Sequence, residues 1–206
     1  MVKNTDKNDS INKIIEGAII EFGEKNFAEA STNSICKISG VSKGLLFHYY
    51  KSKDQLFLEC VSKSFNEIAK YTTENMIVEN TDISKNLQKY FQVRLEFFKE
   101  YPHFEHIFIS AMFNAPMNLT DDILKCKNML DVINRDILKS MLQNLSLKEN
   151  LNIDEIIDYI LDFGNFLVLK FKKNNAYKYF GDEKVFENYN DEFVKFVKML
   201  LYGILK

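Results

Sequence analysis

Residues that interrupt helices are rare in this sequence. The 206 residues include only 2 prolines and 7 glycines, whereas folds built of many short strands need such residues in their tight turns. Hydrophobic residues make up 46% and charged residues 27% of the chain, which is typical of a globular protein rather than a disordered one. We therefore expect an all-α fold with long helices.

Cysteines and long apolar runs are also scarce. The 3 cysteines, Cys36, Cys60 and Cys126, form no CxxC pair, which argues against a disulfide framework and against a thiolate zinc site. No apolar run approaches the ~18 residues that span a membrane, and the opening MVKNTDKNDS lacks the apolar core of a secretory signal. We expect a cytoplasmic protein with buried free thiols, no metal or other cofactor, and no membrane partner.

Positive charge is concentrated in one segment. The formal net charge is −2, and a negatively charged protein is poorly suited to bind DNA phosphates. Residues 30–53, however, contain no Asp or Glu and carry four lysines, Lys37, Lys43, Lys51 and Lys53. This cluster is either a chance grouping on a solvated face or a cationic surface for nucleic acid.

Apolar spacing predicts helices along most of the chain. Apolar residues recur at helical intervals from Ile11 to Phe22, with Ser10 as a possible N-cap, and the polar residues before Ser10 are expected to fray. Two short helices should follow. Longer helices are expected over residues 53–75, 83–100, 102–113, 121–144, 154–173 and 191–205, about nine helices in all.

The two short helices contain the central motif, SGVSKGLLFHYY. Ser31 and Ser42 are placed as their N-caps, and the helices should end near Ser39 and Tyr50. Gly40 suits the left-handed turn between them. This pattern predicts a helix-turn-helix unit, whose second helix enters the major groove of DNA.

The second helix of this unit is expected to have two different faces. The inward positions of the unit should be Ile35, Ile38, Val41, Leu46 and Tyr50. The outer face carries Lys43, Gly44 and Phe47, with Leu45 and His48 beside them, and suits contact with base edges and thymine methyl groups. Gly44 costs about 1 kcal/mol relative to alanine inside a helix. Either close approach of DNA or tight packing against another helix should account for it.

Phosphate contacts are expected from the helix N-termini, where free N–H groups and the helix dipole favour anions. Thr32, Ser42 and Lys53 lie at three such ends, and Tyr49 offers a hydroxyl nearby.

The segments STNSI (residues 31–35) and SGVSKGLLFHYYKSKDQL (residues 39–56) resemble the N-terminal signature of the TetR family of bacterial transcriptional repressors. The resemblance covers residues 11–58 and implies a homodimeric repressor of double-stranded operator DNA. It implies a DNA-binding domain over residues 1–51 and a helical ligand-binding and dimerisation domain over residues 52–206. The implied base contacts are Lys43, Gly44, Leu45, Phe47 and His48, and the implied phosphate contacts are Thr32, Ser42, Tyr49 and Lys53. The chain departs from the family at Phe47, where tyrosine is usual, and at Cys36, where alanine is usual.

Arginine is nearly absent from the chain. Its two arginines, Arg94 and Arg135, lie outside the motif, so arginine cannot contact guanine there. We expect a palindromic operator that is rich in A·T pairs.

Two C-terminal segments are apolar on almost every side. They are FGNFLVLKF (residues 163–171) and FVKFVKMLLYGIL (residues 193–205). A surface helix is not apolar all round, so each segment should bury one side in its own core and another in a homodimer. A dimer also places two DNA-binding units about 34 Å apart, one turn of DNA. The alternative is a monomer in which both helices are internal.

Bulky apolar residues recur in the middle of the chain, where such residues usually form the core. The TetR resemblance implies an inducer cavity among them, for a mostly apolar small molecule whose binding shifts the protein away from its DNA-binding state. The candidate ligand-binding residues are Phe91, Phe108, Met112, Met129, Ile133, Asp162 and Phe166. Tyr90, Asn114 and Asn165 are further candidate polar groups.

Two other functions fit parts of the sequence. His103 and His106 lie three residues apart and could share a metal in an enzyme, although the sequence offers no convincing further ligands. The aromatic C-terminal helix could instead dock on another protein, which predicts no salt-dependent affinity for DNA. The lysine-rich motif favours the regulator, and we expect no enzymatic activity.

Overall fold

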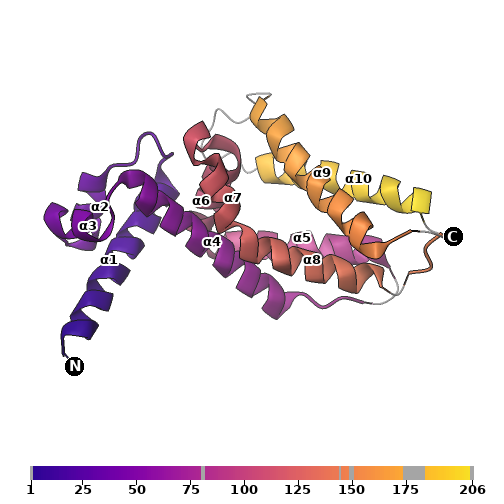
Figure 1. Ribbon diagram of the computed structural model, residues 1–206, viewed down its shortest axis with the longest axis horizontal. Coiled ribbons are helices and arrows are strands. Elements are labelled where there is room, and N and C mark those ends of the chain that lie inside the picture. Colours follow the sequence, from indigo (N-terminus) through magenta and orange to yellow (C-terminus); the bar gives the residue numbers. More distant parts are fainter. Residues whose placement is uncertain (1, 80–81, 144, 149–150, 174–183, 205–206) are drawn as a thin grey trace. The chain divides into compact units, whose positions relative to one another are not determined.

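The computed structural model is all-α and describes residues 2–79, 82–143, 145–148, 151–173 and 184–204 (Figure 1). The α-helices in these ranges are α1 (Val2–Glu24), α2 (Thr32–Ser39), α3 (Lys43–Tyr49), α4 (Lys53–Asn75), α5 (Ile83–Glu100), α6 (Pro102–Ile109), α7 (Thr120–Cys126), α8 (Asn128–Leu142), α9 (Ile153–Lys173) and α10 (Lys184–Ile204). A π-helical turn, Ser110–Asn114, follows α6, and a 3-10 turn, Met117–Leu119, precedes α7. The expected fold class is confirmed.

The chain forms two compact units. The first contains Met1–Asn66 and Glu100–Lys127, and the second contains Glu67–Lys99 and Asn128–Lys206. The first unit therefore joins α1, α2 and α3 to the beginning of α4 and to α6 and α7. The division into residues 1–51 and 52–206 is a division by function, and it stays a prediction.

An aromatic cluster forms part of the core of the first unit. Phe22 and Phe57 are fully buried, with ring centroids 5.1 Å apart, and Phe27 lies 5.0 Å from Phe57. Ile14 and Ala18 on the same face of α1 are also fully buried. Helix α1 packs against α2 and α6, so the buried face predicted from its spacing is confirmed.

In the second unit, α9 packs against both α8 and α10. Figure 1 shows α9 (orange) and α10 (yellow) side by side. The rings of Phe163 and Phe196 stack between them at 3.6 Å. Leu167 and Val197 are fully buried, so each helix contributes one apolar face to the core of this unit.

Helix boundaries differ from expectation in four places. Helix α1 begins at Val2 rather than near Ile11, because the polar residues before Ser10 include no proline or glycine that would stop it. Helix α6 ends at Ile109 and gives way to the π-helical turn. Helix α10 begins at Lys184 rather than near residue 191, so Asn190 lies inside it and is buried.

The fourth difference is a break at Lys127, where one helix was expected over residues 121–144. The segment forms α7 and α8 instead. Lys127 is buried, and the thiol of the neighbouring Cys126 donates to the carbonyl oxygen of Leu58, 3.6 Å away. Because this segment contains no helix breaker, tertiary packing accounts for the division.

Candidate nucleic-acid interface

Serine caps define the helix-turn-helix unit. The hydroxyl of Ser31 accepts a hydrogen bond from the N–H of Asn33 at 3.2 Å, and that of Ser42 accepts one from Leu45 at 3.1 Å. Ser52 Oγ accepts from Gln55 at 3.1 Å at the start of α4. Each cap satisfies an N–H group that a helix start leaves unpaired. The N-caps Ser31 and Ser42 predicted from the sequence are confirmed, whereas the possible N-cap Ser10 lies inside α1, so that prediction is wrong.

Gly40 makes the turn between α2 and α3. Its φ of 68° lies in the left-handed region, which costs a residue with a Cβ about 1 kcal/mol or more. The N–H of Val41 then donates to the carbonyl oxygen of Cys36 at 3.2 Å. The chain reverses at Gly40 as predicted, and α3 starts three residues later, at Lys43.

The outer face of α3 is open to solvent. Lys43, Gly44 and His48 are exposed, and Leu45, Phe47 and Tyr49 are partly exposed. The inward residues Leu46 and Tyr50 are buried. The Nζ atom of Lys43 lies 6.0 Å from the centroid of the Phe47 ring. The two faces of α3 are therefore those expected from the sequence.

The prediction that Ile38 faces inward is wrong. Its side chain is 41% exposed, whereas Ile35 is fully buried. Ser39 occupies the position next to α1 instead, because a Cβ placed on Gly17 would lie 3.0 Å from the Cβ of Ser39. Helix α2 has only about two turns, so a single apolar position faces α1.

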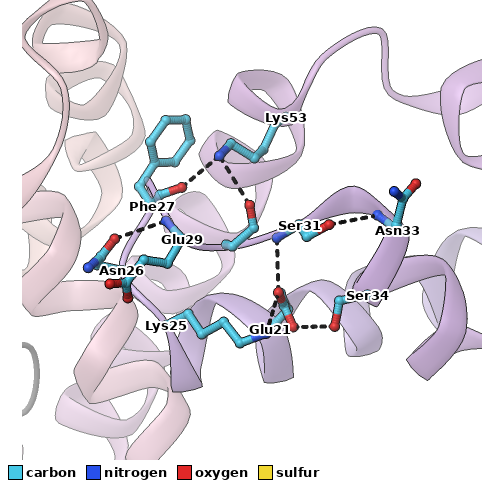
Figure 2. Close-up of polar contacts among 10 residues, drawn as sticks. Glu21, Lys25, Asn26, Phe27, Glu29, Ser31, Asn33, Ser34 and Lys53 are labelled. Atoms are coloured by element: carbon cyan, nitrogen blue, oxygen red, sulfur yellow. Dashed lines mark hydrogen bonds and ion pairs between the residues drawn. The ribbon is translucent and has the colours of Figure 1, made fainter.

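Lys53 has an internal role that the sequence did not reveal. Its ammonium group donates to the carbonyl oxygens of Phe27 at 2.8 Å and Ala30 at 3.1 Å. Figure 2 shows the bond from Lys53 to Phe27. The same group lies 4.5 Å from the centroid of the Phe27 ring. Lys53 thus fixes the connection between α1 and α2. The other three lysines of this segment, Lys37, Lys43 and Lys51, are exposed instead.

Glu21 is a second positioning residue that the sequence analysis missed. Its carboxylate is 1% exposed and accepts hydrogen bonds from the N–H of Ser31 at 2.9 Å and the hydroxyl of Ser34 at 2.6 Å (Figure 2). It also pairs with Lys25 at 2.9 Å. The sequence did contain one indication that Glu21 is buried: it lies next to Phe22 and three residues after Ala18, on the buried face of α1.

The charge of Glu21 is favoured by its partners. Burial alone would raise its pKa, but the hydrogen bonds from Lys25, Ser34 and Ser31, with the charge of Lys25, outweigh burial and lower the pKa below its ordinary value. An ionised carboxylate therefore connects α1 to the first turn of α2, and it fixes the position of the helix-turn-helix unit against α1.

The two histidines of the metal alternative lie on α6. The Nδ1 atom of His106 contacts the carbonyl oxygen of Gly23, and His103 packs on Gly23. In the part of the chain that the structure describes, no group of three or more His, Cys, Asp or Glu could hold a metal ion. The histidines contribute to the junction of α1 and α6.

The candidate ligand-binding residues fall in both units. In the second unit, Phe91 is buried and lines a pocket of about 830 Å³ between α5 and α10. Ile133 is partly exposed on α8, and Met129, Asp162 and Phe166 are exposed. In the first unit, Phe108 and Met112 are buried. The second unit thus brings Phe91 to a pocket, while Met129, Asp162 and Phe166 lie at its surface.

The additional polar candidates differ in burial in the same way. Tyr90 is buried, whereas Asn114 and Asn165 are exposed.

The three cysteines are free thiols, with Cys60 buried and Cys36 and Cys126 partly exposed. Across the described residues, no helix combines the length and hydropathy needed to cross a membrane.

Comparison with known proteins identifies the N-terminal region. A family model described as bacterial regulatory proteins, tetR family, matches residues 14–60. The HTH-type transcriptional repressor AcnR of Corynebacterium diphtheriae is 30% identical over 79 residues, which are 38% of this chain and 42% of that protein. The chain thus spans less than half the length of this curated relative.

Solved structures share the fold over nearly the whole chain. A transcriptional regulator from Rhodococcus sp. RHA1 is 19% identical with a TM-score of 0.62, covering 93% of this chain and 94% of that one. The transcriptional regulator FadR from Bacillus subtilis, solved in complex with stearoyl-CoA, is 16% identical with a TM-score of 0.57, covering 91% and 97%. All three of these proteins are transcriptional regulators. The family match covers the capped helix-turn-helix unit, so residues 14–60 of this chain are similar to the tetR family of bacterial regulatory proteins.

Proposed function

We propose that this protein is a TetR-family repressor that binds a palindromic operator as a homodimer and leaves it when a mostly apolar small molecule binds. Residues 1–51 bind DNA, and residues 52–206 form the dimer and bind the ligand. The observation that carries the proposal is the exposed outer face of α3, which includes Lys43 and no acidic residue and is positioned by the caps of Ser31 and Ser42. The repressor AcnR and the stearoyl-CoA complex of FadR support it.

The proposed DNA contacts follow from the two faces of α3. Bases are contacted by Lys43, Gly44, Leu45, Phe47 and His48, and phosphates by Thr32, Ser42, Tyr49 and Lys53. Because the ammonium group of Lys53 is bonded to two carbonyl oxygens, its phosphate contact uses the free N–H at the start of α4. The operator is palindromic and rich in A·T pairs.

Gly44 provides the sharpest test of the DNA contact. A Cβ at this position would meet only the hydroxyl of Ser42, 4.0 Å away, so tight packing against another helix is ruled out as its explanation. Gly44→Ala should stabilise the fold by about 0.5–1 kcal/mol, because alanine is the better helix former. It should also weaken operator binding about tenfold, because the methyl group occupies the space that the DNA needs.

Wild type and Gly44→Ala are compared by their binding, at two salt concentrations, to labelled DNA from upstream of the protein's own gene. Thermal unfolding of the same samples measures their stability. A Lys43→Ala, Tyr49→Ala double variant is the reference for loss of specific binding, and removing a phosphate contact should reduce the salt dependence. A Gly44→Ala protein that is more stable and binds DNA as tightly as the wild type would contradict the predicted approach of DNA to α3.

The proposed dimer uses the outer faces of α9 and α10. Tyr159, Phe166, Leu169, Met199 and Tyr202 each expose more than half of their surface. They recur at intervals of three or seven residues within each helix, which places them on one side of it. Apolar side chains that leave water on association contribute about 1.5–3 kcal/mol each. These faces of α9 and α10 are the part of the second unit best suited to pack against a second copy of the chain.

Leu169→Asp should weaken the dimer at least about tenfold, because it buries a charge where leucine is proposed to lie. Sedimentation velocity at micromolar concentration measures the change. Leu124→Asp is the matched control, since Leu124 is also exposed but lies on α7 in the other unit. A wild-type protein that sediments as a monomer would overturn the proposed dimer.

The pocket between α5 and α10 is the proposed ligand site. Phe91, Leu95 and Val194 provide apolar walls. Asn190 also lines the pocket, is buried, and has an amide oxygen without a hydrogen-bond partner among the described residues. Mostly apolar walls with a few polar groups are typical of small-molecule sites.

A further inference from the structure

Arg94 on α5 is a buried cation in the second unit. It is 7% exposed. Its Nη2 atom donates to Oδ1 of Asn134 on α8 at 2.8 Å, and the hydroxyl of Tyr90 donates to the same oxygen at 2.7 Å. The guanidinium carbon lies 4.5 Å from the centroid of the Tyr90 ring. The Nε–H group of Arg94 has no hydrogen-bond partner among the described residues.

The partners of Arg94 are all neutral. Among the described residues, no carboxylate lies within 4.0 Å of its guanidinium group. Burial raises the pKa of Tyr90 and that of Tyr189, so neither tyrosine supplies a phenolate at neutral pH. Asp131, one turn before Asn134 on α8, is partly exposed and has interactions of its own. The positive charge is therefore buried without a paired anion.

An unpaired buried charge is costly in a protein, and an unmade hydrogen bond to it adds to that cost. Contact with the Tyr90 ring and one hydrogen bond offset only part of it, because an arginine offers five N–H donors in a fork that matches a carboxylate or a phosphate. An anion bound at Nε would satisfy both the charge and the free donor.

The position of Arg94 connects this cluster to the proposed ligand pocket. Phe91 and Asn190 line the pocket between α5 and α10, and they directly follow Tyr90 and Tyr189 in the sequence. The rings of Phe91 and Phe193 pack 5.7 Å apart between these helices. Arg94 lies one turn after Phe91 on α5. The apolar walls and the buried cation are thus built from neighbouring residues of the same helices.

We propose that Arg94 binds the anionic head of the regulating ligand, which is an amphiphile with an apolar body and a single carboxylate or phosphate group. The proposal rests on the proposed function, since it assumes that this unit binds the regulating ligand. It adds a charged recognition group to a ligand otherwise described as mostly apolar.

The test compares three probes that share one chain and differ in the head: dodecanoate, dodecyl phosphate and dodecan-1-ol. Calorimetric titration of the full-length protein below the micelle concentration gives each dissociation constant. At least one anion should bind roughly tenfold to a hundredfold more tightly than the alcohol, the range of a hydrogen bond to a charged group. Whichever anion binds tighter identifies the head group.

Two variants separate Arg94 from a general preference for anions. Arg94→Gln should bind the anions no more tightly than the alcohol, while its affinity for the alcohol stays within about twofold of the wild type. Lys195→Gln removes an exposed cation that lines the same pocket and should keep the preference. If Arg94→Gln does not fold, the proposal is tested by the affinities of the wild-type protein, which must bind the anions more tightly than the alcohol.

Equal affinity of the wild type for all three probes overturns the role of Arg94, and so does a preference that survives in Arg94→Gln. Release of operator DNA is measured with the same probes. If alcohol and anions release DNA equally well, the apolar-ligand function stands and the role of Arg94 falls. If no probe binds, both the ligand function and the role of Arg94 fail, whereas DNA binding is tested separately through Gly44.

Discussion

Glu21→Ala is expected to lower the free energy of unfolding of the first unit by about 3 kcal/mol. The change leaves the N–H of Ser31 and the hydroxyl of Ser34 without their acceptor, and breaking a buried charged network typically costs about 3–5 kcal/mol. We take the lower end because the partner Lys25 is 41% exposed and its ion pair is screened by solvent. Urea unfolding followed by circular dichroism measures the loss.

The matched control is Glu24→Ala, since Glu24 lies on the same helix but is exposed. A surface substitution of this kind should change stability by no more than about 0.5 kcal/mol. DNA binding should fall in Glu21→Ala but not in the control, because the carboxylate holds the start of α2 against α1. Equal, small losses in the two variants would show that Glu21 does not position the helix-turn-helix unit.

The contribution of Glu21 should also depend on pH. Its pKa is lowered in the folded protein, so the stabilisation is fully present above the unfolded value of about 4.3 and is lost as the pH falls through the lower folded value. The stability difference between wild type and Glu21→Gln should therefore be larger at pH 7 than at pH 3. A difference that is constant over this range would contradict an ionised, stabilised carboxylate.

Gly23→Ala is expected to destabilise the first unit by up to about 2 kcal/mol. A Cβ on Gly23 would lie 2.6 Å from Cβ and 2.8 Å from Cα of His103, and neither atom can move without shifting α6. Crowding a packed interface costs about 1–3 kcal/mol, and the gain of roughly 1 kcal/mol that alanine brings to a helix offsets part of that cost. Thermal unfolding of the variant measures the net effect.

Gly44→Ala is the control for Gly23→Ala, because it makes the same substitution where the methyl group meets almost nothing. The two variants should change stability in opposite directions. A Gly23→Ala protein as stable as Gly44→Ala would mean that α1 and α6 can separate at no cost. That result would remove the close contact of Gly23 with His103 as a structural constraint.

The helix-turn-helix unit could be predicted from the sequence because its determinants are local. The caps of Ser31, Ser42 and Ser52 each act within two or three residues, and Gly40 sets a backbone angle at its own position. The faces of α3 follow from helical periodicity. These features depend on residue types at fixed short spacings, so a single sequence contains all the information that they need.

Other features were decided by tertiary contacts between residues far apart in the sequence. Glu21 and Lys53 are charged residues of ordinary appearance, and only the folded chain brings them to the groups that they hold across 10 to 26 positions. The break at Lys127 has no local signal either.

The sequence by itself therefore determined the fold class, the caps and the exposed face of α3, because short-range spacing dictates them. The tertiary structure alone decided which charges became buried, Glu21 among hydrogen-bond donors and Arg94 without a paired anion. The reason is that burial and charge pairing depend on how whole helices pack, and the intrinsic preferences of neighbouring residues do not specify that packing.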